Sequence, residues 1–145
     1  MRFVLFVISM VTLAGLAAAC SSEDKGGGKV NVALKEWGVS TDRPDVPKGD
    51  VQFEVKNEGP DHDHEMIIIR TDLAPNALPF EDNGVPEEKV NIIGEIEPFA
   101  AKSKASSTFN LPAGKYVLIC NITEIENGAV ESHYNMGMRV VLTVQ

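Results

Sequence analysis

Histidine, cysteine and methionine are the residue types in this sequence that can bind a soft or borderline metal ion. After the first twenty residues the chain contains three histidines, one cysteine and three methionines. Every one of these methionines lies within five positions of a histidine, so the metal-binding residues gather in two stretches, 62–66 and 120–138. A thiolate, imidazoles and a thioether together suit copper in both of its oxidation states. The sequence therefore predicts a copper site that draws on both stretches.

Three short motifs contain the residues that are the strongest candidates. His64 follows the turn Asn57-Glu58-Gly59 and opens an apolar run. Cys120 ends the segment Leu-Pro-Ala-Gly-Lys-Tyr-Val-Leu-Ile-Cys, in which a tyrosine precedes the cysteine by four positions. His133 begins His-Tyr-Asn-Met-Gly-Met, which ends at Met138. Each motif is weak alone, but the three in this order form a specific pattern.

In this order the motifs resemble the cupredoxin family, the plastocyanin- and azurin-like blue copper proteins. The resemblance covers most of the chain after residue 30. It implies a cupredoxin-like Greek-key β-sandwich of about seven strands that holds one type 1 copper ion. It also implies that His64, Cys120, His133 and Met138 are the copper ligands.

The resemblance assigns roles to two further residues. The backbone N–H of Glu65 is expected to donate to the Cys120 sulfur and so to tune the redox potential. Asn121 is expected to link the two ligand loops by hydrogen bonding. The segment between the cysteine and the next histidine, residues 121–132, departs from the family because it is longer than in the better-known members. It is rich in glutamate and contains Asn-Gly, a turn signal, so it can bulge outward and return.

Two ligand positions have alternatives nearby in the sequence. His62 could replace His64, and Met136 could replace Met138. We prefer His64 because it directly joins the apolar run, whereas His62 lies between two aspartates in a polar turn. We prefer Met138 because a glycine immediately precedes it, as in plastocyanin-type sites.

The elements that must position these residues are β-strands. Apolar and polar residues alternate in several segments, the period-two pattern of half-buried strands, and no long amphipathic helix is visible. The irregular segment 71–88 is predicted to hold at most one short helical turn, at 73–78. Short strands at this spacing indicate a β-sandwich or barrel. The predicted strands are 29–37, 51–56, 64–69, 90–96, 105–111, 115–120 and 138–144.

The N-terminus is predicted to direct export and membrane attachment. Residues 1–19 combine a basic start, an apolar run too short to span a membrane, and small residues at the end, which indicates a signal peptide. The ending Ala-Ala-Ala-Cys20 resembles the lipobox of bacterial lipoproteins, although Leu16 lies one position further from the cysteine than usual. We therefore expect Cys20 to be lipidated and residues 20–29, which include three consecutive glycines, to form a flexible tether. The cupredoxin domain is predicted at 30–145.

The net charge of the chain and its number of cysteines limit which partners and which roles for Cys120 are plausible. Without the signal peptide the chain has twelve basic and twenty-one acidic residues, a net charge of −9, which argues against a nucleic-acid partner. The same charge permits a cationic protein partner. With Cys20 at the processing site, Cys120 is the one thiol left in an exported chain, and a metal ligand is one of the few roles for such a thiol.

The sequence thus predicts a monomeric one-electron carrier of the cell envelope or periplasm, anchored to a membrane by its N-terminal lipid. Its partner would be a redox protein or a copper acceptor. Copper storage or delivery with the same ligands is the first alternative, and a metal-free binding module is the second. We expect no enzymatic activity, because Cys120 and His133 could form a nucleophile and base but no third orienting group is visible.

Overall fold

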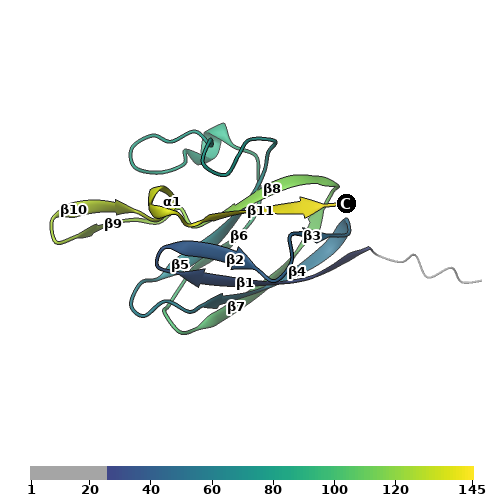
Figure 1. Ribbon diagram of the computed structural model, residues 1–145, viewed down its shortest axis with the longest axis horizontal. Coiled ribbons are helices and arrows are strands. Elements are labelled where there is room, and N and C mark those ends of the chain that lie inside the picture. The colour runs from purple at the N-terminus through teal and green to yellow at the C-terminus, as the bar shows by residue number, and fades with distance from the viewer. Residues whose placement is uncertain (1–25) are drawn as a thin grey trace, which may run out of the picture.

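The alternating segments form two β-sheets in the computed structural model, which describes residues 26–145 (Figure 1). The first sheet has the strand order β2-β1-β4-β7 and the second has the order β3-β11-β8-β5-β6. The first comprises β1 (Gly27–Lys35), β2 (Gly38–Thr41), β4 (Gly49–Asn57) and β7 (Lys104–Leu111). The second comprises β3 (Asp45–Val46), β5 (His64–Arg70), β6 (Ile92–Phe99), β8 (Gly114–Ile119) and β11 (Arg139–Val144).

The architecture is the predicted cupredoxin-like sandwich. Within residues 26–145, seven strands have six or more residues, and each overlaps one of the seven predicted segments. β1 begins at Gly27, so the last three residues of the predicted tether belong to the first sheet. The predicted signal peptide, Cys20 and most of the tether lie outside the described residues. No helical turn forms at 73–78, where the chain makes only a hydrogen-bonded turn, and one turn of 3-10 helix (Glu87–Lys89) follows later.

The sandwich core lies between the two sheets. Alternate residues of β4, Val51, Phe53 and Val55, are buried there, while the residues between them are exposed. β5 is buried on both faces, as its run of isoleucines predicts: Ile68 packs between the sheets, and Ile67 and Ile69 pack on the outer side. There the irregular segment between β5 and β6 covers them with Leu78 and Val85 (Figure 1). Burial of each isoleucine side chain contributes about 1.5–3 kcal/mol to the free energy of folding. The packing on both faces therefore holds the strand that carries His64 in place.

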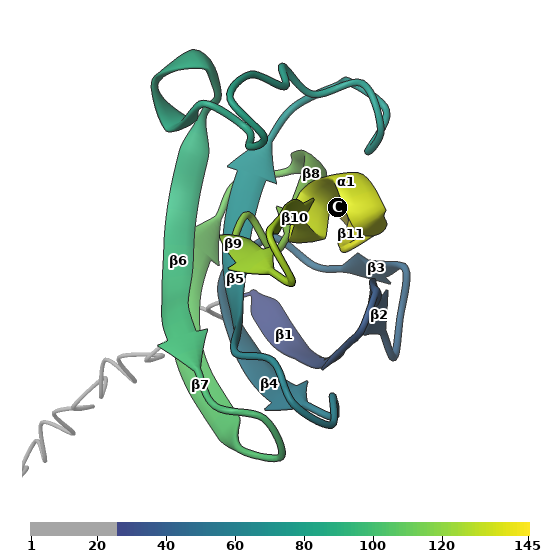
Figure 2. The ribbon, with the colours of Figure 1, turned by 90° about the vertical axis from the view of Figure 1, so that its left-hand side faces the viewer.

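The glutamate-rich segment after Cys120 folds as a hairpin rather than a loop. β9 (Thr123–Glu126) and β10 (Ala129–Ser132) pair with each other and with no other strand of residues 26–145. Asn127 and Gly128 have φ values of 50° and 81°, which a two-residue type I′ turn requires. The hairpin projects from the end of the sandwich opposite the C-terminus, and α1 (His133–Met136) follows it directly (Figures 1 and 2).

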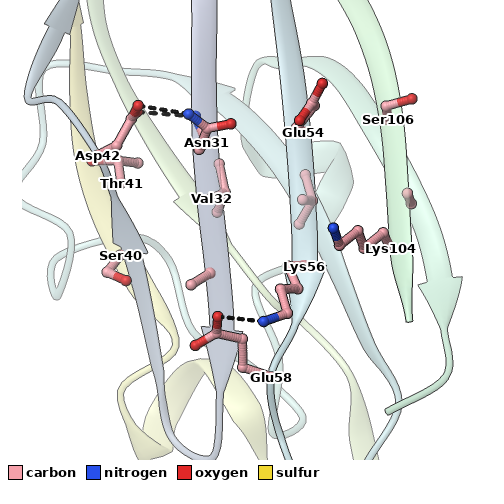
Figure 3. Close-up of a pocket in the computed structure, with 13 residues that line it drawn as sticks. Asn31, Val32, Ser40, Thr41, Asp42, Glu54, Lys56, Glu58, Lys104 and Ser106 are labelled. Carbon is pink, nitrogen blue, oxygen red and sulfur yellow. Dashed lines mark hydrogen bonds and ion pairs between the residues drawn. The ribbon is translucent and has the colours of Figure 1, made fainter. Parts of the chain in front are cut away.

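A groove on the exposed face of the first sheet is lined by residues of β1, β2, β4 and β7 and of the adjoining turns, most of them polar or charged (Figure 3). Its side chains bond to one another, as in the 2.7 Å contact of Asn31 with Asp42 and the 2.9 Å contact of Lys56 with Glu58. The groove contains no histidine or cysteine, so the metal-binding residues lie elsewhere. None of the helices in residues 26–145 is long and apolar enough to span a membrane.

Candidate metal centre

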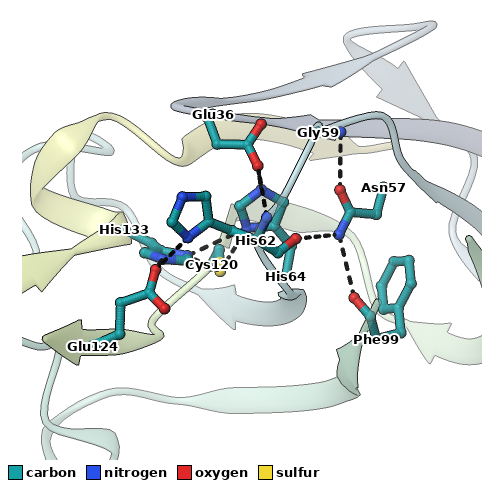
Figure 4. A network of polar contacts seen from close by, with 9 residues as sticks. All are labelled: Glu36, Asn57, Gly59, His62, His64, Phe99, Cys120, Glu124 and His133. Carbon is teal, nitrogen blue, oxygen red and sulfur yellow. Dashed lines mark hydrogen bonds and ion pairs between the residues drawn. The ribbon is translucent and has the colours of Figure 1, made fainter. Parts of the chain in front are cut away.

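Three donor atoms from separate parts of the chain meet at one end of the sandwich. Nδ1 of His64 lies 3.3 Å from Nδ1 of His133, and Sγ of Cys120 lies 3.3 Å from the latter and 3.9 Å from the former. All three side chains are fully buried, and they point toward one another (Figure 4). His64 is the first residue of β5, Cys120 directly follows β8, and His133 is the first residue of α1.

The triangle of donors has the size that one metal ion requires. Nitrogen and sulfur ligands lie about 2.0–2.3 Å from a zinc-sized ion, so three of them arranged around it in a plane are separated by about 3.5–3.8 Å. The observed separations of 3.3–3.9 Å bracket that range. One thiol and two imidazoles are also ligands that copper accepts. The residues present therefore fit a three-ligand copper plane.

Strand pairing produces this arrangement. β5 and β8 are antiparallel neighbours, with Ile67 opposite Ile119, so the start of β5 and the end of β8 lie at the same end of the sheet. β8 also pairs with β11, and the backbone N–H of Cys120 donates to the Met138 carbonyl at 3.1 Å. The short helix α1 returns the chain from His133 to β11. All of the predicted ligands are thus attached to three adjacent strands of one sheet.

The two C-terminal methionines differ in burial. Met138 is fully buried in the same core cluster as Cys120, whereas the side chain of Met136 is among the exposed apolar ones. Gly137 separates them with a φ of 129°, and a Cβ there would lie 2.9 Å from the Trp37 carbonyl oxygen. The preceding glycine that favours Met138 in the sequence therefore has a structural reason, since the chain must turn sharply next to Trp37.

His62 lies outside the donor triangle. Its Nδ1 is 2.6 Å from Oε1 of Glu124, and its ring packs against Trp37 with a centroid distance of 5.0 Å. Trp37 also packs against His133, at 4.8 Å. Trp37 therefore packs against both His62 and the candidate ligand His133. The sequence gives no local signal that Trp37 contacts these histidines.

The surroundings of Cys120 oppose ionisation of the free thiol. Burial raises the pKa of this thiol to about 12. Hydrogen bonds from the backbone amides of Glu65 and Ile122 favour the thiolate and so oppose part of this rise. The thiol is therefore protonated near neutral pH in the metal-free protein, and a metal ion must displace that proton.

His64 is held ready to act as a neutral ligand. Burial and the neighbouring His133 lower the pKa of His64, so its imidazole stays uncharged. On the side of that ring away from the donor triangle, Nε2 lies 3.6 Å from Oε1 of Glu36. The Glu36 carboxylate also accepts the backbone N–H of His62 at 3.1 Å and packs directly against Gly59, where a Cβ would collide with it.

Glu124 is a site residue that the sequence did not identify. Its Oε1 lies 2.9 Å from Nε2 of His133, and hydrogen bonds from His133 and His62 lower its pKa (Figure 4). A carboxylate at Nε2 keeps the proton on that nitrogen and leaves Nδ1 free to bind a metal. The only signal in the sequence was the richness of residues 121–132 in glutamate, which does not distinguish one glutamate from another.

Asn121 and Asn57 stabilise the segments that carry the ligands. The backbone N–H of Asn121 donates to Oε1 of Glu65 at 2.9 Å, whereas its side chain bonds to the backbone of Val85 rather than to the other ligand loop. The link between the two ligand segments therefore runs through the Glu65 carboxylate. Buried Asn57, which sequence reasoning assigned only to a turn, bonds to the backbones of His62, Gly59 and Phe99 and so orients the turn before His64.

Comparison with known proteins identifies the fold. No protein-family model and no curated protein matches the sequence. Among solved structures, reduced auracyanin from Roseiflexus castenholzii is 22% identical, with a TM-score of 0.55 over 83% of this chain and 97% of its own. Auracyanin A, a "blue" copper protein from Chloroflexus aurantiacus, is 22% identical, with a TM-score of 0.55 over 83% of this chain and 100% of its own. Rusticyanin from Thiobacillus ferrooxidans is 19% identical, with a TM-score of 0.52 over 83% of this chain and 78% of its own. The chain therefore has the cupredoxin fold.

Proposed function

We propose that this protein holds one type 1 copper ion and carries single electrons. His64, Cys120, His133 and Met138 would hold the ion through two imidazole nitrogens, one thiolate and one thioether. The observation that carries the proposal is the buried triangle of two Nδ1 atoms and one Sγ, with separations of 3.3–3.9 Å. Auracyanin A, which shares the fold, is a blue copper protein, and this likeness supports the same assignment.

The bound copper would gain and lose one electron. The protein's own residues would hold the ligand geometry constant while that happens. Strand pairing at β5, β8 and β11 fixes the positions of the ligands, and the amides of Glu65 and Ile122 stabilise negative charge on the Cys120 sulfur. Burial of the donors excludes water. A site that changes little between oxidation states suits electron transfer, so we infer that the protein is a carrier and not an enzyme.

Copper storage or delivery is the alternative that uses the same ligands. A delivery protein must release its ion to an acceptor, which favours ligands that an acceptor can reach. Here the side chains that carry the donor atoms are fully buried, and Trp37 and Glu124 both contact the His133 ring. The enclosure supports electron transfer over delivery. We further propose that the carrier acts in the cell envelope, held to a membrane by a lipid on Cys20, on the strength of the N-terminal sequence alone.

The test is the spectrum of the protein titrated with Cu(II). The chain without its predicted signal peptide, carrying Cys20→Ser to remove lipidation and the second thiol, would be compared with the same chain carrying Cys120→Ala. An intense blue absorption band and narrow copper hyperfine splitting in EPR, both lost with Cys120→Ala, are expected. Binding that is colourless or independent of Cys120 would refute the type 1 assignment.

A second measurement separates transfer from delivery. Cyclic voltammetry should show a reversible one-electron wave, and the reduced protein should keep its copper in the presence of a Cu(I) chelator. Rapid loss of Cu(I) to the chelator, with irreversible voltammetry, would instead identify a delivery protein.

A further inference from the structure

The β9–β10 hairpin presents an exposed apolar pair next to the metal centre. Ile125 and Val130 are direct cross-strand partners, so their side chains lie side by side on one face of the hairpin. They are 75% and 53% exposed, the two most exposed large hydrophobic residues in the described part of the chain. Because the hairpin has no third strand and no core beneath this face, these side chains contribute at most a cross-strand contact to its stability.

The opposite face of the hairpin contacts a proposed copper ligand. Side chains alternate along a strand, so Glu124 points away from the Ile125 face, and it lies 2.9 Å from Nε2 of His133. His133 itself is fully buried, so no partner can touch its ring. The hairpin therefore connects an exposed apolar surface to the metal centre through two consecutive residues of one strand.

Charge on the hairpin restricts what could bind there. Residues 121–138 contain three glutamates and no lysine or arginine, and exposed Glu126 is in the turn-proximal position of β9. An anionic membrane surface would be repelled by this charge. A second copy would bring two acidic hairpins together in a chain whose formal net charge is already −8. A protein with basic residues around an apolar depression is complementary to both features.

We propose that the face of the β9–β10 hairpin formed by Ile125 and Val130 is the docking surface for a cationic redox protein that exchanges electrons with the metal centre. The inference rests on the proposed electron-transfer function. One electron leaves the reduced partner and one is gained at the centre, and no bond is made or broken. The apolar pair supplies the desolvated contact, and the glutamates accelerate and orient the encounter.

Stopped-flow kinetics with a purified cationic c-type cytochrome as the probe tests the surface. The double variant Ile125→Thr/Val130→Thr keeps β-branched side chains and therefore strand propensity while making the surface polar. We expect the second-order rate of electron exchange to fall about tenfold, as loss of a central apolar contact does at other interfaces. Glu126→Gln should flatten the dependence of the rate on ionic strength.

The matched control is Leu73→Thr, which makes the same kind of change at an apolar residue that is 45% exposed on the segment between β5 and β6. It should leave the rate unchanged. An undiminished rate in the hairpin variant, or an equal fall in the Leu73→Thr control, would overturn the proposal. Two further results would overturn it. One is a dimer of the parent protein, detected by sedimentation, that the hairpin variant does not form. The other is binding of the parent protein, but not of the hairpin variant, to phosphatidylcholine–phosphatidylglycerol vesicles.

Two measurements distinguish failure of the docking proposal from failure of the proposed electron-transfer function. Reduction by ascorbate, which needs no docking surface, should be equally fast in all variants; if ascorbate never reduces the copper-loaded protein, the electron-transfer function fails. Calorimetric titration of the cytochrome into the protein then still decides the docking surface, because binding does not require electron transfer. Equal affinity of the parent and the hairpin variant for the cytochrome would refute the docking proposal and leave the electron-transfer function standing.

Discussion

The carboxylate of Glu124 lies 2.9 Å from Nε2 of His133, on the side of the ring opposite the nitrogen that faces Cys120. This contact joins the hairpin to the metal centre. It places the imidazole proton on Nε2, where the carboxylate accepts it, so that Nδ1 carries the lone pair that a metal needs. The same oxygen contacts His62 at 2.6 Å, which holds the carboxylate in position. His62, Glu124 and His133 thus form a second group of potential metal ligands, with ligand atoms within 4.8 Å of one another, and these contacts explain the group as a hydrogen-bonded support for the donor triangle.

Glu124→Gln should weaken copper binding without altering the ligands. The amide keeps a similar shape but loses the negative charge that orients and polarises His133, and changes of this kind cost about 10–100-fold in metal affinity. Competition with a chelator of known affinity measures the change. Glu126→Gln, two residues along the same strand, is the control and should bind copper as the parent does. Equal losses in the two variants would show that only the net charge of the hairpin matters.

Substitution of the two C-terminal methionines should distinguish their roles. Met138→Leu preserves volume in the core and should cost less than about 1.5 kcal/mol in the free energy of unfolding, yet it removes the proposed thioether ligand and should shift the reduction potential. Met136→Leu changes a residue that is 39% exposed and should alter neither quantity. Voltammetry and denaturant unfolding measure both effects. A potential that moves with Met136→Leu and not with Met138→Leu would reverse the ligand assignment.

Substitution of His64 and of His62 should show which of the two histidines is a copper ligand. His64→Gly removes a donor atom of the triangle and should abolish the blue absorption band, which added imidazole should restore by entering the vacated position. His62→Gly removes a contact of Glu124 and should leave the band in place with weaker copper binding. Absorption titrations with and without imidazole make the comparison. A band that survives in His64→Gly and disappears in His62→Gly would place the ligand two residues earlier.

The contribution of Glu65 to the stability of the metal-free protein should fall as the pH rises toward neutrality. Burial, opposed by the Asn121 amide and reinforced by nearby glutamates, raises the pKa of Glu65 to about 7 from its ordinary 4.5. Between these values the folded state binds more protons than the unfolded state, so the free energy of unfolding decreases with pH, by up to about 3 kcal/mol, and levels off above pH 7.

Urea unfolding from pH 4.5 to pH 8 measures this dependence. Glu65→Gln should remove most of the decrease, because the neutral amide can still accept the Asn121 N–H. Glu88→Gln, at an exposed position, is the matched control and should retain the full decrease. A profile in Glu65→Gln as steep as that of the parent would show that another group is responsible.

Much of the fold could be predicted because it depends on local patterns. The alternation in β1 and β4 and the isoleucines of β5 indicate which faces are buried, and strand positions follow from that. The turn signal at Asn127-Gly128 also has a local cause, since both residues tolerate positive φ. The pairing of β9 with β10 was not predicted, because alternation is weak in a hairpin that has no core on either side.

The sequence by itself determined the kinds of donor atom and their order along the chain, because residue type decides which metals a side chain can bind. Only the tertiary structure decided which of the neighbouring candidates meet. Strand pairing brings His64, Cys120 and His133 within 3.9 Å of one another, whereas His62, two residues away, bonds to Glu124 instead. The physical reason is that contacts across 13 to 69 residues of chain depend on register and packing, which no local spacing encodes.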